Sequence, residues 1–394
     1  MHCYVYFIFN YILNILDSQL NILKLSRFFC RTPCQLLRVD FAGNRFGIRV
    51  ELSRKRNQEG SIGTMTDKIG VALYGNFGHQ IGKLLINHDR ARLIGVAEFP
   101  DASISSLREQ IPDFTVFSGL DELLASPEVS IVSFCSPRRR DQAGQCIRAL
   151  EAGKHVYAEK PCAMTEPDLD GILATAKRTG LHFHEMAGTS VWQPFRAMRD
   201  IVRSGTIGEV IQVLAQKSYP YNDKRPQNED IDGGLIGQNS IHAVRFVEHV
   251  AGVRVRDVDA IETRKGNPVA DGGLHMAATL MLTLENGGVA GIVANYLNPK
   301  GFGMHGNEHL RIFGTKGFIE AVDGATRTRL VVGDRDHGPI DISEPGWDYF
   351  NLMLNSILDG TPMPYTLADE LHPTRVVIRA KAAAARRAES ANDS

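Results

Sequence analysis

Between residues 68 and 188, apolar runs of strand length alternate with amphipathic segments of helix length. The apolar runs are continuous, which is typical of strands covered on both faces of a sheet. Strands separated by helices of about 10–15 residues indicate βαβ units and a parallel sheet. The expected strands are 68–74, 91–99, 114–119, 130–137, 155–161 and 181–188, and the expected helices are 78–87, 121–129, 141–154 and 166–180. The pattern predicts an α/β domain over 65–188.

After residue 188 the order of elements changes. Two helices, 194–205 and 235–252, flank one strand, 208–219, and a loop rich in Pro, Asn and Asp, 219–234. The strands that follow come one after another: 254–264, 274–288, 288–297, 308–317, 318–324 and 329–334. Asn286-Gly287 between two apolar runs favours a hairpin. We expect an α+β domain over 189–394 with a mostly antiparallel open sheet, and terminal helices of which the last packs back on the first domain.

Composition excludes several classes of protein. The 394 residues carry 44 basic and 45 acidic side chains, so no global field favours nucleic acid or an anionic membrane. The six cysteines form no C-x-x-C pair and no cluster with histidine at zinc spacing. Scattered cysteines in a long chain are typical of a reducing compartment. We therefore expect a cytoplasmic protein without a metal.

Residues 1–64 differ from the rest of the chain. Residues 1–16 are aromatic and rich in Ile and Leu, but they are shorter than the about 20 residues of a membrane span. The basic residues follow the apolar run, and no small-residue cleavage site is present, unlike a signal peptide. We interpret 1–64 as an extension outside the fold, with Met65 as the natural start; a membrane anchor is the alternative.

The stretch 71–82, VALYGNFGHQIG, lies where a strand ends and a helix is expected to begin. Gly75 and Gly78 have the spacing of the second and third glycines of a G-x-G-x-x-G fingerprint, with Leu73 at the first. We expect the turn at Leu73–Gly75 to present N–H groups to a pyrophosphate. A second register that begins at Gly75 loses two glycines and is less favoured. Gly75 would let the backbone approach a pyrophosphate, and Gly78 would let the helix pack close to the sheet. The turn residues Gly75, Asn76, Phe77 and Gly78 are therefore candidate cofactor contacts.

An acidic residue follows the second expected strand. Glu98 comes 23 residues after Gly75, where the ribose hydroxyls of a dinucleotide are held. A carboxylate there repels a 2′-phosphate, and no arginine follows at once. The cofactor expected is NAD rather than NADP.

Five motifs together resemble the glucose-fructose oxidoreductase/inositol dehydrogenase (Gfo/Idh/MocA) family, from residue 68 to about residue 388. They are Glu159-Lys160-Pro161, Ser136-Pro137, RSGTIGEV (203–210), GG…H (233–242) and IFGTKGFIE (312–320). The resemblance implies a Rossmann domain, a second domain with an open antiparallel sheet, a nicotinamide cofactor and oxidation of a sugar or polyol carbon, or its reverse. It also implies that the open sheet forms a homodimer or homotetramer surface.

The resemblance places Lys160 beside the hydroxyl that loses hydride, with Ser136, Pro137 and Glu159 on the cofactor side. A free lysine has a pKa of about 10.4 and is a poor base at neutral pH. Burial beside a nicotinamide ring lowers such a pKa by units. Pro161 favours an extended backbone at Lys160, which directs its side chain.

The helix 235–252 departs from the family pattern. His242 is present, but the aspartate that usually stands four residues earlier is Gln238. Residues at i and i+4 share a helix face, so both side chains are expected to meet the substrate. Without the carboxylate, His242 should stay near pKa 6.5 and mostly neutral at pH 7.

Further candidates rest on position alone. Trp192 stands where the family tends to have an aromatic residue near the substrate. Lys217, Tyr219 and Tyr221 would share one strand face. Arg245 is a candidate for binding an anionic group of the substrate. Asp141, where many relatives carry a cofactor-side histidine, is expected to cap a helix.

The sequence leaves three functions open. The first is an NAD-dependent dehydrogenase of a sugar or polyol, with Lys160, His242 and Gln238 at the reacting carbon. The second is a binding protein for NAD or a ligand without turnover, favoured by Gln238 and Leu73. The third is an NAD-dependent enzyme that cleaves a bond through transient oxidation.

Overall fold

The computed structural model describes residues 39–42, 45–48, 68–186 and 188–392. Contacts divide the chain into two units, 1–64 and 65–394. Of the expected extension, only an antiparallel hairpin of β1 (Val39–Ala42) and β2 (Arg45–Ile48) lies within the described residues. Within the described ranges, no helix combines the length and apolarity that crossing a membrane requires.

The N-terminal half of the larger unit is a parallel six-stranded sheet in the order β5-β4-β3-β6-β7-β8. Its strands are β3 (Ile69–Tyr74), β4 (Ala91–Ala97), β5 (Thr115–Val116), β6 (Ile131–Phe134), β7 (His155–Glu159) and β8 (Phe183–Met186). Between them lie the 3-10 helix η1 (Ile81–Leu85) and the α-helices α2 (Asp101–Arg108), α3 (Leu120–Ala125), α4 (Arg139–Glu151) and α5 (Glu166–Thr179). The predicted doubly wound Rossmann sheet is confirmed, and its order reverses between β3 and β6.

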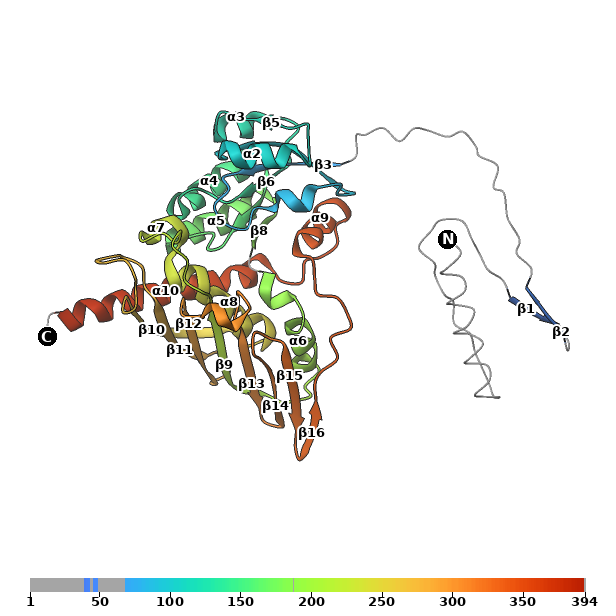
Figure 1. Cartoon of the computed structure of the whole chain (residues 1–394), viewed down its shortest axis with the longest axis vertical. Helices are drawn as coiled ribbons and strands as arrows, with labels where there is room; N and C mark the ends of the chain where they lie inside the picture. Colours follow the sequence, from blue (N-terminus) through green and yellow to red (C-terminus); the bar gives the residue numbers. More distant parts are fainter. Residues whose placement is uncertain (1–38, 43–44, 49–67, 187, 393–394) are drawn as a thin grey trace. The chain divides into compact units, whose positions relative to one another are not determined.

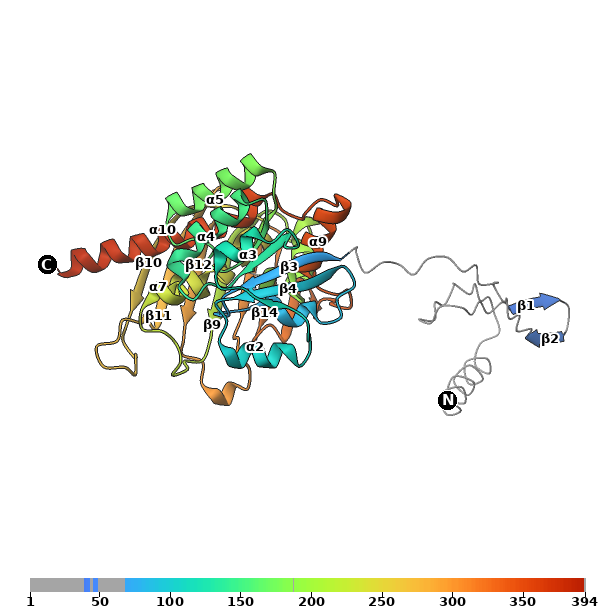
Figure 2. The ribbon, with the colours of Figure 1, turned by 90° about the horizontal axis from the view of Figure 1, so that it is seen from above.

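Each face of the parallel sheet has its own apolar core. Helices α4 and α5 cover one face with residues such as Cys146, Leu150 and Ile172. The opposite face packs against α9 (Tyr349–Asp359), whose Phe350 and Met353 join the core of β3. A helix from the C-terminal end of the chain thus covers the first sheet (Figures 1 and 2).

The C-terminal half contains an eight-stranded sheet in the order β10-β11-β12-β9-β13-β14-β15-β16. Only the β9–β12 pairing is parallel, so the expectation of a mostly antiparallel sheet is confirmed. The strands are β9 (Val210–Ser218), β10 (Val255–Thr263), β11 (Ala277–Leu284), β12 (Val289–Asn295), β13 (His309–Gly314), β14 (Gly317–Val322), β15 (Arg327–Val332) and β16 (Arg335–Gly338). The Asn286-Gly287 turn joins β11 to β12, as its sequence predicts.

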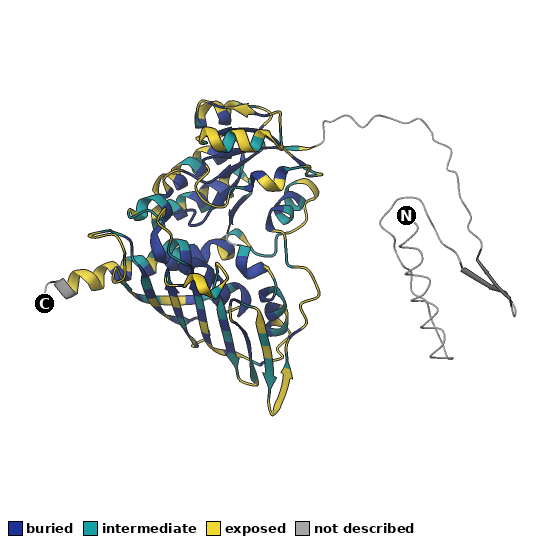
Figure 3. Ribbon diagram, viewed as in Figure 1, coloured by how far each residue is buried: buried dark blue, intermediate teal, exposed yellow. Residues whose placement is uncertain are grey.

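The helices of this half are η2 (Gly188–Val191), α6 (Phe195–Arg203), α7 (Glu229–Asp232), the π-helical turn η3 (Ile236–Ser240), α8 (Ile241–Arg245), the π-helical turn η4 (Phe246–Val250), η5 (Lys300–Phe302) and α10 (Leu367–Asn392). Of these, α6, η3, α8, η4 and α10 pack against the sheet. The continuous segment η3-α8-η4 is buried between the two sheets (Figure 3). Helix α10 packs along β10 and also contacts α5 and β8, so the last helix reaches the first domain.

Five elements of the larger unit were not expected from the sequence: η2, α2, α7, η5 and β16. Helix α2 has no buried residue, and one expected helix is much shorter. The helix expected over 78–87 is the five-residue 3-10 helix η1. The backbone before it is held extended, because the Gln80 side chain caps Ile81 N–H at 2.9 Å and its amide donates to the Gly75 carbonyl at 2.8 Å.

Candidate active site

The turn after β3 depends on Gly75. Gly75 has φ +68, and a Cβ there would lie 2.2 Å from the Cys135 carbonyl oxygen, so any side chain would collide with β6. Leu73 lies earlier, inside β3, fully buried and paired with β4 and β6. The expectation that Leu73 itself forms part of the turn is wrong: the strand continues to Tyr74, and the turn begins at Gly75.

Backbone donors in this turn are only partly free. The N–H groups of Gly75, Phe77 and His79 donate to Ala97 O, Cys135 O and the Glu159 carboxylate. Among the described residues, those of Asn76 and Gly78 have no partner. Because sheet and turn bonds use the N–H groups up to Gly75, Asn76 and Gly78 are the candidate donors to a pyrophosphate, rather than the expected Leu73–Gly75 segment.

Gly78 makes room for a carboxylate, not for the expected close packing of a helix. It has φ +134, and a Cβ there would lie 2.8 Å from the Glu159 carboxylate. Glu159 is buried at the end of β7 and accepts from His79 N–H at 2.6 Å and His79 Nδ1 at 3.0 Å. Burial alone would raise the pKa of Glu159, but His79, Lys160 and Arg139 outweigh it and lower this pKa to about 2. Glu159 is therefore a fixed anion.

The other cofactor candidates lie at the same edge of the sheet. Glu98 follows β4 as an exposed carboxylate with φ 56. Ser136 and Pro137 follow β6, where the Ser136 hydroxyl donates to Gln145 Oε1 at 2.7 Å. Asn76 donates its amide to Ser103 at 3.0 Å. The carboxyl ends of β3, β4, β6 and β7 thus carry every cofactor candidate, which is where doubly wound sheets bind dinucleotides.

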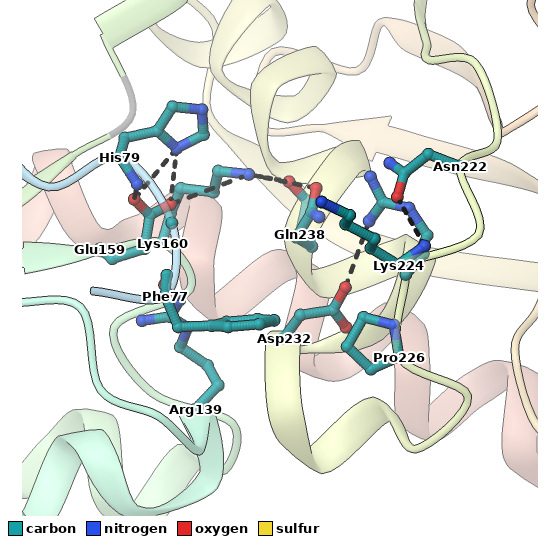
Figure 4. A pocket seen from close by; sticks show the side chains of 12 residues that line it. Phe77, His79, Arg139, Glu159, Lys160, Asn222, Lys224, Pro226, Asp232 and Gln238 are labelled. Carbon is teal, nitrogen blue, oxygen red and sulfur yellow. Dashed lines mark hydrogen bonds and ion pairs between the residues drawn. The ribbon is translucent and has the colours of Figure 1, made fainter. Parts of the chain in front are cut away.

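Lys160 is a buried cation beside this edge. Its Nζ donates to the Gln238 carbonyl oxygen at 2.7 Å and to Gln238 Oε1 at 3.2 Å, and it lies 4.0 Å from Glu159 Oε1 (Figure 4). Burial lowers the pKa of Lys160 to about 8, with Glu159 opposing the shift. About a tenth of the side chain is then unprotonated at pH 7, compared with less than a thousandth for a free lysine.

Gln238 and His242 belong to the buried segment between the sheets. Gln238 lies in the π-helical turn η3, a form that frequently marks functional sites. His242 is buried; its Nδ1 lies 3.1 Å from the Thr189 hydroxyl, and its Nε2 has no partner among the described residues. Burial and the charges of Lys160 and Lys217 lower the pKa of His242 well below its ordinary value, so the ring is neutral at pH 7.

The remaining candidate residues lie in different environments. Lys217 is buried, forms an ion pair with Glu308 and lies 5.0 Å from the centre of the Tyr219 ring. Trp192 is 57% exposed. Asp141 lies in the first turn of α4 and does not cap it, since Arg138 is the N-cap.

Arg245 does not fit the role of an anion receptor. It is buried with its Nη2 2.6 Å from Glu185 Oε2, so its charge is neutralised within the protein. The anion that Arg245 binds is the Glu185 carboxylate of the protein itself. The sequence could not indicate this pair, because the two residues lie 60 positions apart in the chain.

Residues from both halves of the larger unit line one cavity (Figure 4). Its lining includes several residues that sequence reasoning did not single out: His79, Arg139, Asn222, Lys224, Arg225, Pro226 and Asp232. All seven come from the arginine run 138–140, from the loop 219–234 or from the position next to Gly78, so the only signal in the sequence was that they lie near recognised motifs. Lys160 and Gln238 line the same cavity, whereas His242 is not among its lining residues.

One group in the described part of the chain has the side chains of a metal site. Ligand atoms of Glu229, Glu262 and His275 lie within 4.8 Å of one another. The Lys381 ammonium forms ion pairs with both carboxylates. A protein cation thus already offsets part of this negative charge.

Together these features define a class: an NAD(P)-binding oxidoreductase with a Rossmann half and a second half that completes the site. Residues 68–186 match the oxidoreductase family with an NAD-binding Rossmann fold, and residues 195–320 match the GFO/IDH/MocA C-terminal domain. The chain belongs to the Gfo/Idh/MocA family of oxidoreductases.

Individual relatives are distant. The chain is 26% identical over 282 residues to the uncharacterized oxidoreductase YrbE of Bacillus subtilis, covering 69% of this chain and 79% of that protein. It is 23% identical to myo-inositol 2-dehydrogenase of Thermotoga maritima, covering 68% and 78%. The aldose-aldose oxidoreductase of Caulobacter crescentus, solved with glycerol, has a similar fold with a TM-score of 0.68 at 21% identity, covering 81% and 98%.

Proposed function

We propose that this protein is an NAD-dependent dehydrogenase of a CH–OH group in a sugar or polyol. The observation that carries the proposal is Lys160, a buried lysine with a lowered pKa in the cavity between the two halves. The names of its relatives, myo-inositol 2-dehydrogenase and aldose-aldose oxidoreductase, support the substrate class. A cytoplasmic location and the site residues belong to the same proposal.

The residues at the edge of the sheet fit a dinucleotide. Gly75 allows a turn that a side chain would block, and the N–H groups of Asn76 and Gly78 are unpartnered among the described residues. The exposed Glu98 carboxylate suits ribose hydroxyls and disfavours a 2′-phosphate, which supports NAD over NADP. The cofactor supplies the hydride acceptor: the substrate carbon gives up hydride and its hydroxyl gives up a proton.

Lys160 would receive that proton. In its unprotonated form the amine accepts the hydroxyl proton as the C–H bond breaks, which leaves a carbonyl and an ammonium group. The neutral His242 would hold the substrate oxygen through its unpartnered Nε2. The Gln238 amide would position the substrate and leave the charge of Lys160 unneutralised, since it is not a carboxylate.

One observation favours a binding protein without turnover. Both oxygens of Gln238 accept from Lys160, and such bonds stabilise the ammonium form, which is not a base. Turnover therefore requires that a substrate hydroxyl displaces at least one of these acceptors.

A titration and a rate assay separate these functions. Fluorescence titration should show that the wild type binds NADH tightly and NADPH at least about tenfold more weakly. Glu98→Gln should reduce this difference in affinity. A panel of polyols and sugars should yield NADH absorbance at 340 nm, and Lys160→Met should abolish it. Tight NADH binding without oxidation of any panel member would support the binding protein. Conversion of a substrate to a cleaved product, with no net formation of NADH, would support the enzyme that cleaves a bond through transient oxidation.

A further inference from the structure

The cavity lining carries an excess of positive charge. Its cationic side chains are Arg139, Lys160, Lys224 and Arg225, and its carboxylates are Glu159 and Asp232, which leaves a net charge of +2 without counting His79. A low-dielectric cavity with such an excess attracts anions. An uncharged sugar would not use this charge.

Three of the four cations have partners within the protein. Arg225 lies 3.2 Å from Asp232 and 3.1 Å from the Tyr296 hydroxyl. Arg139 donates to the Phe77 carbonyl at 2.8 Å and to Gln142. Lys160 donates to Gln238, as described above.

Lys224 is the exception among these cations. Its ammonium forms no ion pair with a carboxylate in the described part of the chain, and it is exposed on the loop before α7. In Figure 4 its side chain extends toward Gln238, the residue that Lys160 also contacts. Lys224 from the C-terminal half and Lys160 from the Rossmann half thus both line the cavity.

The loop holds Lys224 in this position. The Lys224 N–H donates to the Asn222 side chain at 3.1 Å, and the Arg225 N–H donates to the Asn222 carbonyl at 3.0 Å. Arg225 is anchored to Asp232 and its guanidinium lies 4.0 Å from the centre of the Tyr296 ring. The backbone on both sides of Lys224 is therefore fixed, and its side chain remains available.

Lys224 comes from the C-terminal half, whereas the candidate cofactor residues lie at strand ends of the Rossmann sheet. Gly78 and Glu159 from that sheet edge line the same cavity as Lys224. Lys217, a second buried lysine on β9, adds positive charge near Lys160, although Glu308 offsets it.

We propose that the substrate is an anionic polyhydroxy compound, a sugar acid or a sugar phosphate, whose charged group is bound by Lys224 while the reacting hydroxyl lies at Lys160. This inference rests on the proposed dehydrogenase function and narrows its substrate class.

The test compares matched ligands by calorimetry on the full chain: D-glucitol, D-gluconate and D-glucitol 6-phosphate. With NADH bound, an alcohol cannot be oxidised, so binding is measured without turnover. At low ionic strength, at least one anionic ligand should bind about 10-fold more tightly than D-glucitol, and added salt should reduce the difference. Which anion is preferred distinguishes a carboxylate from a phosphate.

Variants assign the preference to Lys224. Lys224→Gln should remove most of the 10-fold preference, Lys224→Arg should retain it, and Lys177→Gln on the exposed face of α5 should leave it unchanged. Equal or weaker binding of both anions relative to D-glucitol, no binding of any ligand, or a preference that survives Lys224→Gln would overturn the inference.

The titrations repeated without NADH separate this inference from the proposed function. If NADH binds and uncharged polyols are oxidised but anions have no advantage, the dehydrogenase stands and the anionic substrate fails. If NADH does not bind but the Lys224-dependent preference remains, the anion site stands and the dehydrogenase fails.

Discussion

At the scale of single residues, the environment of Lys160 determines its chemistry. Its side chain is as buried as the apolar core, and the nearest carboxylate is 4.0 Å from its Nζ. Desolvation disfavours the ammonium, and Glu159 only partly restores it, so the pKa settles at about 8. A lysine with that pKa changes its charge within the pH range of ordinary enzyme assays.

This pKa predicts the pH dependence of oxidation. Since the unprotonated amine accepts the hydroxyl proton, kcat/KM for oxidation should rise about tenfold per pH unit below the pKa and level off above about pH 8. Reduction of the matching carbonyl should show the opposite trend. Initial rates from about pH 6 to about pH 10 measure both. A profile for oxidation that is flat through pH 8 would exclude Lys160 as the base.

The turn after β3 requires a residue without a side chain at position 75. A Cβ at Gly75 meets the Cys135 carbonyl at 2.2 Å, whereas at Gly153, with φ +80, it meets nothing within 4 Å. Gly75→Ala should therefore lower the free energy of unfolding by about 2–4 kcal/mol, and Gly153→Ala by only about 1 kcal/mol. Urea unfolding compares the two variants; equal losses would show that backbone strain alone explains both. NADH affinity should fall only in Gly75→Ala.

At the scale of elements, one buried carboxylate forms hydrogen bonds with the segments that carry the catalytic candidates. Glu185 on β8 accepts from Cys162 N–H at 2.7 Å, from Arg245 at 2.6 Å and from the Thr374 hydroxyl at 2.9 Å. It thereby joins the turn after Lys160, the helix after His242 and α10. The relative position of Lys160 and Gln238 depends on this junction.

Replacing this carboxylate should cost stability and rate together. Glu185→Gln leaves the buried Arg245 charge without its paired carboxylate, with only the more distant Glu370 to offset it, which should cost about 3–5 kcal/mol of unfolding free energy. Glu128→Gln, which breaks the exposed pair with Arg92, should cost no more than about 1 kcal/mol. The double variant Glu185→Leu/Arg245→Met should recover most of the stability but not kcat, because the turn at Cys162 still lacks its acceptor. Recovery of both would mean that Glu185 acts only on stability.

At the scale of the whole molecule, the open face of the eight-stranded sheet is apolar. Ile261, Met281, Val289 and Val293 lie on β10, β11 and β12 and are 42–59% exposed. The residues that alternate with them are buried against the helices. Exposed apolar surface of this kind marks interaction sites, so the expectation of a homodimer or homotetramer remains a proposal.

Two charges on this face should disrupt such an assembly. Met281→Asp/Val293→Asp should convert the oligomer to monomers without changing the far-UV circular dichroism spectrum, since both side chains point away from the core. Sedimentation velocity measures the mass. Ile342→Asp, an exposed residue outside the sheet, is the control. A wild-type monomer, or an oligomer that survives both substitutions, would exclude this face.

Local pattern was sufficient for most of the architecture. The strands of both sheets, the hairpin at Asn286-Gly287 and the edge carrying Gly75, Glu98 and Lys160 follow from apolar periodicity, turn chemistry and spacing along the chain. Helix α2 was missed because it buries little, and the length of the helix after Gly78 was overestimated because the Gln80 side chain holds the backbone before Ile81 extended.

The sequence by itself determined the two-part fold, the cofactor edge and the lysine at the end of β7, since these depend on residues close together in the chain. Only the tertiary structure decided the charges: that Arg245 is neutralised by Glu185, that Gln238 meets Lys160, and that Lys224 enters the cavity without a carboxylate. The physical reason is that desolvation and ion pairing act through space, between segments that are distant in the sequence and adjacent only after folding.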